Sequence, residues 1–159
     1  MAAPIRVLMV CTGNICRSPT AEVVLRQLAE RAGCGHRLSV ASAGTHGYHV
    51  GEPPDRRAQA HARARGYDLS GLRARRLAAE DFQACDWLLA MDAGHLQAMR
   101  QLRPADAPGQ LALLLTSPPG RPPRDVPDPY YGEAADFERV IDLVEQGCQD
   151  WLQRWGLSR

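Results

Sequence analysis

Lysine is absent from this chain of 159 residues, in which all nineteen basic side chains are arginines. Without a lysine, the protein cannot form a Schiff base, use a lysine as a general base, or hold a nucleotide with the lysine of a Walker A loop. Nineteen arginines and eighteen acidic residues leave a formal charge of +1. With 45% apolar and 23% charged residues, the composition is that of an ordinary globular chain. We expect one domain spanning residues 1–159.

Long hydrophobic runs are also missing. The longest, Val7–Cys11, Trp87–Met91 and Leu111–Leu115, hold about five residues, whereas a membrane-spanning helix needs about twenty. The run after Arg6 is too short for a signal peptide. The five cysteines, an odd number without a C-x-x-C pair, indicate free thiols in a reducing compartment and no zinc site. We therefore expect a cytoplasmic protein without membrane insertion and without a metal.

Short apolar runs alternate along the chain with segments of helical periodicity. The tail carries the strongest helical signal, because apolar residues recur at offsets 0, 3, 4, 7, 11, 14, 15 and 18 from Phe137. The predicted strands are 5–10, 38–43, 87–91 and 111–115, and the predicted helices are 17–32, 53–65, 93–102 and 137–155. Strands that alternate with helices predict an α/β fold, in which helices cover a parallel sheet on both faces.

Two segments have biased composition. Residues 55–76 carry a net charge of +5 and residues 125–150 a net charge of −7, which we interpret as solvated helix faces. No aromatic residues are interleaved with the arginines, so we expect no nucleic-acid partner. Residues 116–129 include six prolines, and the part from 116 to 124 is predicted to be a stiff surface connection or a polyproline ligand.

Chemistry concentrates in residues 11–18, between the first predicted strand and the first predicted helix. Ligands of α/β folds bind at this end of a strand, and a loop followed by a helix N-terminus can aim backbone N–H groups at an oxyanion. Those donors and Arg17 favour the thiolate form of Cys11, which is a nucleophile. The fork of Arg17 can bind two oxygens of a phosphoryl group, and Ser18 can donate a hydrogen bond to the thiolate.

At these residues the chain resembles the low-molecular-weight protein tyrosine phosphatases. Residues 10–19 read V-C-T-G-N-I-C-R-S-P, and residues 128–132, about 110 positions later, read D-P-Y-Y-G. The resemblance extends to Ser42-Ala43-Gly44-Thr45 and to Met91-Asp92. It implies a three-layer sandwich with a central four-stranded parallel sheet of order 2-1-3-4 and a phosphate-binding loop after strand 1. It also implies hydrolysis of phosphotyrosine in proteins through a cysteinyl-phosphate intermediate, without a cofactor.

The resemblance assigns three catalytic roles. Cys11 is the nucleophile, Arg17 holds the phosphate, and Asp128 is the general acid that protonates the departing tyrosine oxygen. Pro127 and Pro129 limit the backbone freedom of Asp128. Asp125 is a competing acid, but it lacks the Pro-Tyr-Tyr context.

Other positions are implied to bind or support. The family usually has histidine where this chain has Leu72, which puts one hydrogen bond to Asn14 in doubt. Cys16 is implied to form a redox pair with Cys11, the alternative being that it only packs beneath the loop. Tyr130 and Tyr131 match phosphorylation positions of the family, although paired tyrosines also anchor loops. The implied phosphate-binding residues are Thr12, Gly13, Asn14, Ile15, Cys16 and Ser18; the implied substrate walls are Tyr48 and Tyr131; and the implied loop supports are Ser42 and Asp92.

Four other functions are weighed against this one. A thioredoxin-coupled arsenate reductase needs two further cysteines, and only Cys85 lies in the corresponding region. A protein-arginine phosphatase has threonine in place of Ile15. A non-catalytic phosphopeptide-binding module or a redox sensor would not need Cys11, Arg17 and Asp128 together. We expect a monomer whose partner is a tyrosine-phosphorylated protein, for which a bacterial tyrosine kinase is one candidate.

Overall fold

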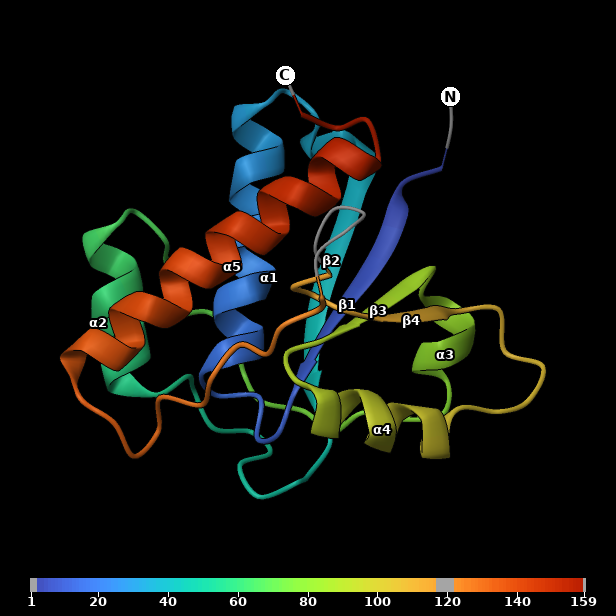
Figure 1. Ribbon diagram of the computed structural model, residues 1–159, viewed down its shortest axis with the longest axis horizontal. Coiled ribbons are helices and arrows are strands. Elements are labelled where there is room, and N and C mark those ends of the chain that lie inside the picture. The colour runs from blue at the N-terminus through green and yellow to red at the C-terminus, as the bar shows by residue number, and fades with distance from the viewer. Residues whose placement is uncertain (1–2, 117–121, 159) are drawn as a thin grey trace.

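The computed structural model describes residues 3–116 and 122–158. Its centre is a four-stranded sheet of β1 (Ile5–Cys11), β2 (Leu38–Gly44), β3 (Trp87–Ala90) and β4 (Gln110–Leu113). All pairs are parallel, and the order is β2-β1-β3-β4, as predicted. In Figure 1 the strands β1 and β2 run downward, and the loops that follow them lie at the lower end of the molecule.

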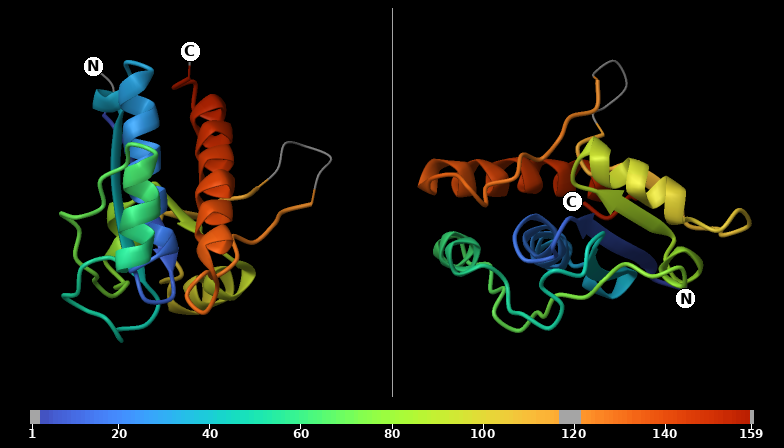
Figure 2. Two further views of the ribbon diagram at one scale, coloured as in Figure 1. Left: turned by 90° about the vertical axis from the view of Figure 1, so that its left-hand side faces the viewer. Right: turned by 90° about the horizontal axis from the view of Figure 1, so that it is seen from below.

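Helices cover both faces of the sheet, which confirms the three-layer prediction. On one face, Val7 and Met9 pack against α1 (Arg17–Arg31) and α5 (Ala134–Arg154). On the other, Leu8 and Val10 contact a second cluster that includes residues of α3 (Asp81–Ala84) and α4 (Ala93–Leu102). The helix α2 (Arg56–Ala64) does not cover the sheet but lies beside α5 (Figures 1 and 2). Strand residues alternate between the faces, so that both are buried.

Three predicted boundaries differ from the structure by two or more residues. The second helix begins at Arg56 and not at residue 53, because Asp55 is its N-cap and accepts hydrogen bonds from the backbone of Arg57 and Ala58. The fourth strand spans Gln110–Leu113 and does not reach residue 115. The tail helix starts three residues early, at Ala134, where Glu133 and Asp136 form a capping box. The short α3 and the 3-10 turn η1 (Gly35–Arg37) were not predicted, because such lengths carry no periodicity.

The proline-rich connection leaves the sheet after β4. Residues 117–121 of this predicted stiff segment lie outside the described residues. On either side of them, the Arg124 amide donates to the Leu115 carbonyl at 3.0 Å. The chain then passes the carboxyl end of β3, where the Val126 amide donates to the Met91 carbonyl at 2.7 Å. The chain after residue 124 therefore lies at the same end of the sheet as the loop after β1.

The helix α5 closes the core. Its apolar stripe packs against α1, and the indole of Trp151 donates to the Leu114 carbonyl at 2.9 Å. No helix within the described residues is long and apolar enough to cross a membrane.

Candidate active site

The loop between β1 and α1 is held from outside by its carbonyl groups. Backbone amides of Thr45, His46 and Asp55 donate to the carbonyls of Cys11, Thr12 and Ile15 at 2.8, 3.0 and 2.8 Å. Gly44 permits this close approach, since a Cβ atom there would lie 2.6 Å from the Thr12 carbonyl oxygen.

The amide groups of the same loop are free to bind an anion. Within the described residues, no amide of positions 13–17 donates to a protein group. The helix α1 follows at Arg17 without a side-chain cap and without an acidic residue in its first turn. Unpaired amides at a helix N-terminus bind phosphate-like groups.

Asn14 is the structural hub of the loop. Its backbone adopts a left-handed conformation (φ 60°), and its side chain is 3% exposed. Asparagine tolerates this conformation better than most residues. The side-chain amide donates to Ser18 Oγ at 2.8 Å and to Ser42 Oγ at 3.0 Å, while its oxygen accepts from the Arg75 backbone at 3.0 Å. The amide thus donates through both of its N–H bonds and accepts through its oxygen, and these three hydrogen bonds fix the loop.

The direction of these hydrogen bonds determines whether the Ser18 hydroxyl can donate to Cys11 Sγ. Ser18 Oγ accepts from Asn14, so its own proton points elsewhere, and Cys11 Sγ lies 2.9 Å away. The other acceptor near Ser18 is the Ala43 carbonyl at 3.5 Å, a much longer contact. Ser18 is completely buried. The geometry favours donation from Ser18 to a Cys11 thiolate.

A buried carboxylate lies behind this network. Ser42 donates to Glu22 Oε1 at 2.6 Å, and Glu22 pairs through its other oxygen with Arg26. Glu22 is 6% exposed. This residue was missed by the sequence analysis, because a glutamate on a helix is usually solvated and nothing in the pattern around it indicates burial.

Arg17 is buried and enters the site from the start of α1. Its Nη1 donates to Asp92 Oδ2 at 2.8 Å and to the Val126 carbonyl at 3.0 Å. Burial raises the pKa of Asp92, but hydrogen bonds from the His95 amide and from the positively charged Arg17 guanidinium outweigh it, and the net shift is downward. Asp92 therefore holds Arg17 in place as a carboxylate.

The predicted acid loop approaches from the opposite side. Asp128 Oδ2 lies 3.7 Å from Arg17 Nη2, and its side chain is 52% exposed. Its Oδ1 accepts from the Tyr130 amide at 3.0 Å. Asp125, the competing acid, instead accepts from the Ala93 amide at the start of α4 at 3.0 Å and does not line the cleft. Of the two carboxylates, Asp128 alone faces the thiol side of the loop.

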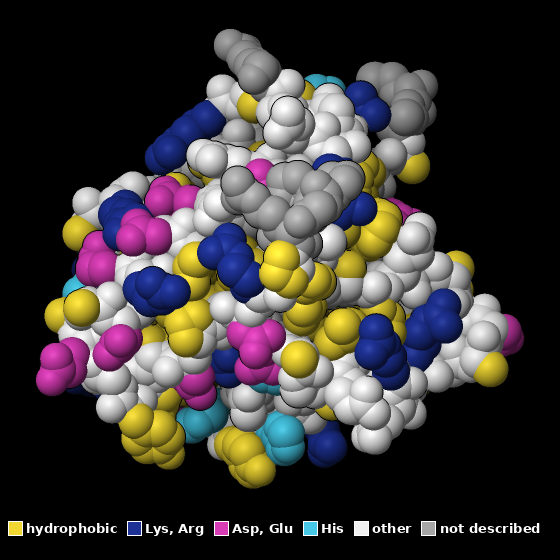
Figure 3. All heavy atoms as spheres, viewed as in Figure 1, with side chains coloured by type: hydrophobic (Ala, Val, Ile, Leu, Met, Phe, Trp, Pro, Cys, Tyr) yellow, Lys and Arg dark blue, Asp and Glu magenta, His cyan; other side chains and the backbone are white. Residues whose placement is uncertain are grey.

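These elements enclose a cleft of about 330 Å³. Tyr48 and Tyr131 stand at its mouth, 73% and 93% exposed. Hydrophobic side chains and histidines gather at this lower edge of the molecule in Figure 3. The lining residues are Cys11, Thr12, Gly13, Ile15, Cys16, Arg17, Tyr48, His49, Asp128, Tyr130 and Tyr131.

Most of the predicted site residues come together here, with differences in role. Asn14, Ser18, Ser42 and Asp92 do not line the cleft and act from behind it, through the contacts given above. His49 and Tyr130 line it and were not predicted as walls. His49 packs over the loop, since a Cβ on Gly13 would lie 2.8 Å from its ring. Its position next to Tyr48 was the one available signal.

With Leu72 in place of the family's histidine, the Asn14 oxygen still has a hydrogen-bond donor. Leu72 packs against the hydrophobic core, and the Asn14 oxygen takes its hydrogen bond from the Arg75 backbone. The second loop cysteine, Cys16, is buried, and burial raises the pKa of its thiol well above the ordinary value. Among the described residues, no three His, Cys, Asp or Glu side chains form a group that could hold a metal ion.

A four-stranded parallel α/β sandwich with a phosphate-type loop, an arginine and a carboxylate around one thiol defines a small cysteine-containing phosphatase. Comparison with known proteins specifies which one. Residues 6–157 match the family described as low molecular weight phosphotyrosine protein phosphatase, and the chain belongs to that family. Its relatives are named protein-tyrosine phosphatases, and the chain is an enzyme of this kind.

Two solved structures and one sequence illustrate the similarity. A low molecular weight protein-tyrosine-phosphatase of Streptomyces coelicolor is 45% identical over 143 residues, covering 88% of this chain and 87% of the relative. YfkJ from Bacillus subtilis has a TM-score of 0.89 at 35% identity, covering 98% and 96% of the two chains. Wzb from Vibrio vulnificus, in complex with benzylphosphonate, has a TM-score of 0.83 at 31% identity, covering 94% and 98%.

Proposed function

We propose that the enzyme hydrolyses phosphotyrosine in proteins by two displacements at phosphorus. In the first, the Cys11 thiolate forms a bond to phosphorus, the bond to the tyrosine oxygen breaks, and Asp128 gives that oxygen its proton. In the second, Asp128 takes a proton from water, which attacks phosphorus and releases phosphate and the thiolate. No oxidant, metal or cofactor enters this balance.

One observation carries the proposal: the Ser18 hydroxyl lies 2.9 Å from Cys11 Sγ and is oriented toward it by Asn14. A hydrogen bond to the charged sulfur stabilises the attacking thiolate and later the leaving thiolate. Arg17 and the free loop amides neutralise the phosphoryl oxygens.

Asp128 suits the role of acid because of where it stands. It is attached to a different loop from the nucleophile, faces the same cleft, and retains solvent access with 52% of its side chain exposed. The 3.7 Å contact with Arg17 connects it to the residue that holds the phosphate.

An aryl phosphate fits the cleft better than a short alkyl phosphate. The thiol lies at the buried base, at 3% exposure, while three tyrosine rings stand around the opening. A phenyl ring spans that depth and stacks on the walls, whereas a phosphoserine is too short. The benzylphosphonate bound by the Vibrio vulnificus relative is an aromatic phosphonate of matching size.

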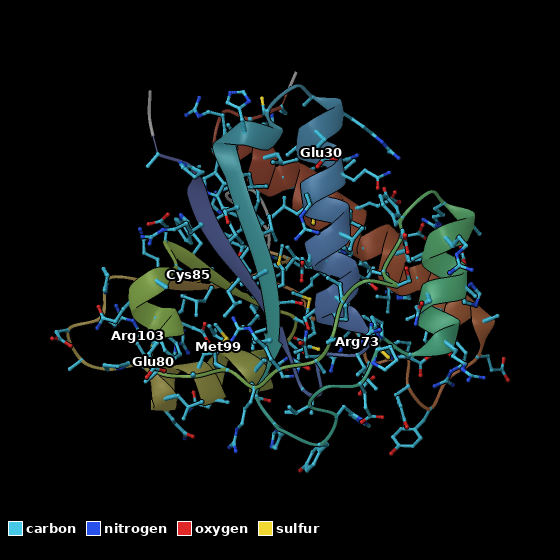
Figure 4. All side chains as sticks on the ribbon, turned by 180° about the vertical axis from the view of Figure 1, so that it is seen from behind. Glu30, Arg73, Glu80, Cys85, Met99 and Arg103 are labelled. Carbon is cyan, nitrogen blue, oxygen red and sulfur yellow. The ribbon has the colours of Figure 1, made fainter. Side chains whose placement is uncertain are left out.

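The alternative functions receive less support. For an arsenate reductase, a second thiol must reach Cys11. Cys85 precedes β3 and therefore lies at the amino ends of the strands, beside α3 (Figure 4), whereas Cys11 lies at the carboxyl end of β1. Ile15 lines the cleft and keeps it apolar, which disfavours a phosphoarginine substrate. A non-catalytic binding module needs no acid at Asp128.

We infer a single catalytic domain that acts as a monomer on tyrosine-phosphorylated proteins, with a bacterial tyrosine kinase as one such substrate. The free thiols of all five cysteines suit the cytoplasm.

Hydrolysis of p-nitrophenyl phosphate and of a phosphotyrosine peptide by the wild type, in the presence of a chelator, tests the proposal. Cys11→Ser is expected to abolish turnover while it still binds phosphate analogues, because a serine hydroxyl stays protonated in a site built for a thiolate. Turnover by Cys11→Ser above a few per cent of wild type, or loss of wild-type activity with chelator and recovery with zinc or magnesium, would refute it.

A further inference from the structure

His95 is a buried histidine to which the proposed reaction gives no role. It lies in the first turn of α4 and is 5% exposed. Its Nε2 is 2.7 Å from Thr12 Oγ1, in the phosphate-type loop, and its Nδ1 is 3.1 Å from Asp92 Oδ1. The ring therefore joins a residue on the rim of the cleft to the carboxylate that holds Arg17.

The imidazole is neutral at ordinary working pH. Burial lowers the pKa of His95 to about 4, although the Asp92 carboxylate opposes this shift. Arg17 and His46 also act to lower it, and Asp128 acts to raise it. A neutral ring carries one proton, which must be on either Nδ1 or Nε2.

The surroundings of Nδ1 decide between the two tautomers. Nδ1 is buried without a partner in regular hydrogen-bond geometry, and the polar atom it faces is Asp92 Oδ1. A carboxylate oxygen can only accept, so an unprotonated Nδ1 would set two lone pairs against each other. The proton therefore belongs on Nδ1, and Nε2 is left as an acceptor for the hydroxyl of Thr12.

We propose that His95 is a positioning residue that makes Thr12 a hydrogen-bond acceptor at the rim, where its oxygen takes a main-chain N–H of the phosphorylated peptide. The inference rests on the proposed function and concerns its substrate contacts. The one hydroxyl proton of Thr12 is committed to His95, so the oxygen can offer only lone pairs to the cleft that it lines. Phosphate oxygens are acceptors and cannot use it, whereas the backbone beside a phosphotyrosine carries N–H donors.

Two substitutions of similar size separate this role from simple packing. In His95→Gln, the carboxamide reaches the position of Nε2 and can still accept from Thr12. In His95→Asn, it reaches only the position of Nδ1 and keeps the contact with Asp92. Met99→Val is the control. Met99 lies on the same helix as His95 (labelled in Figure 4), is fully buried, and packs in the cluster that contains Leu8 and Val10.

The readout is the ratio of kcat/KM for a phosphotyrosine peptide to kcat/KM for p-nitrophenyl phosphate, which has no peptide N–H. For His95→Asn we expect this ratio to fall about 2- to 10-fold, the size of one hydrogen bond, mainly through KM of the peptide. His95→Gln is expected to keep the ratio at the wild-type value. Met99→Val is expected to lower the melting temperature and to leave the ratio unchanged. Equal ratios in the Asn and Gln variants would overturn the proposal.

Nitrogen-15 NMR of the imidazole tests the tautomer without an activity assay. Between mildly acidic and neutral pH, His95 is expected to stay neutral, with the proton on Nδ1. A proton on Nε2, or titration near the ordinary histidine pKa, would overturn the proposal. If the wild type hydrolyses neither substrate, the proposed function fails instead, and the NMR result still decides the state of His95.

Discussion

Replacing Asn14 with Asp keeps the shape of the side chain and turns its hydrogen-bond donor group into an acceptor. The Arg75 amide still finds an acceptor, but the two donors to Ser18 and Ser42 disappear. The Ser18 proton then turns to the new carboxylate, and Cys11 loses the donor that lies 2.9 Å away. The backbone at this position is undisturbed, because aspartate also tolerates the left-handed region.

The contacts set the size of the effect. A hydrogen bond to a charged group contributes about 1.5–3 kcal/mol, so its loss from the Cys11 thiolate is expected to lower kcat/KM by about 10- to 150-fold, at about 1.4 kcal/mol for each factor of ten. Ser42 cannot compensate, because its proton is already donated to Glu22 at 2.6 Å. The new carboxylate oxygen of residue 14 and Ser42 Oγ then face each other in a buried site, which lowers the free energy of unfolding by about 1–3 kcal/mol.

Alkylation of Cys11 by iodoacetamide at fixed, mildly acidic pH reports the thiolate directly. We expect slower alkylation in Asn14→Asp and Ser18→Ala, and no further slowing in the double variant, because both changes remove the same hydrogen bond. Urea unfolding measures the stability loss separately. An Asn14→Asp protein with the wild-type alkylation rate, or additive losses in the double variant, would show that Asn14 does not act through Ser18.

Three further changes test other parts of the site. Asp128→Asn should lower kcat/KM about 10²- to 10⁴-fold on phosphotyrosine but much less on p-nitrophenyl phosphate, whose leaving group needs no proton; equal losses would contradict the acid role. After peroxide, a dithiol should restore the wild type but not Cys16→Ser, and mass mapping should find a Cys11–Cys16 bridge; full recovery of the variant would mean that Cys16 only packs. His95 has a pKa lowered from 6.5 to about 4, so below pH 6.5 the unfolded chain binds a proton that the folded chain does not. Relative to His95→Gln, the wild type should therefore lose up to about 3 kcal/mol of unfolding free energy as pH falls from 6.5 to about 4, measured by urea titration, and parallel curves would contradict this.

The parts of the fold that could be predicted are those with a local signature. Strands buried on both faces give continuous apolar runs such as Val7–Cys11, and the long stripe on α5 has the helical period. The helix that begins at Arg56 shows the limit of this reasoning. Pro53 and Pro54 favour a helix start at residue 53. The N-cap is instead Asp55, whose carboxylate accepts hydrogen bonds from the backbone amides of the first turn.

The same division applies to the site. Cys11, Arg17 and Ser18 are neighbours in one loop, so spacing alone predicts their meeting. The partners that orient them come from distant segments: Asp92 is 75 residues from Arg17, and His95 is 83 residues from Thr12. No local pattern encodes such contacts, because they depend on how two parallel strands place the turns that follow them.

The Leu72 position shows why a departure from the family's pattern need not remove a function. The Asn14 oxygen needs a donor, and here the donor is the Arg75 amide, 3.0 Å away. That amide is held in place by the chain around it: the Ala74 and Leu77 amides donate to the carbonyls of Glu52 and Gly44, and the Gly44 amide donates to the Arg75 carbonyl. A main-chain donor does not depend on which side chain is present, proline excepted. The loop's geometry is therefore insensitive to residue 72, which is free to pack as leucine against the core.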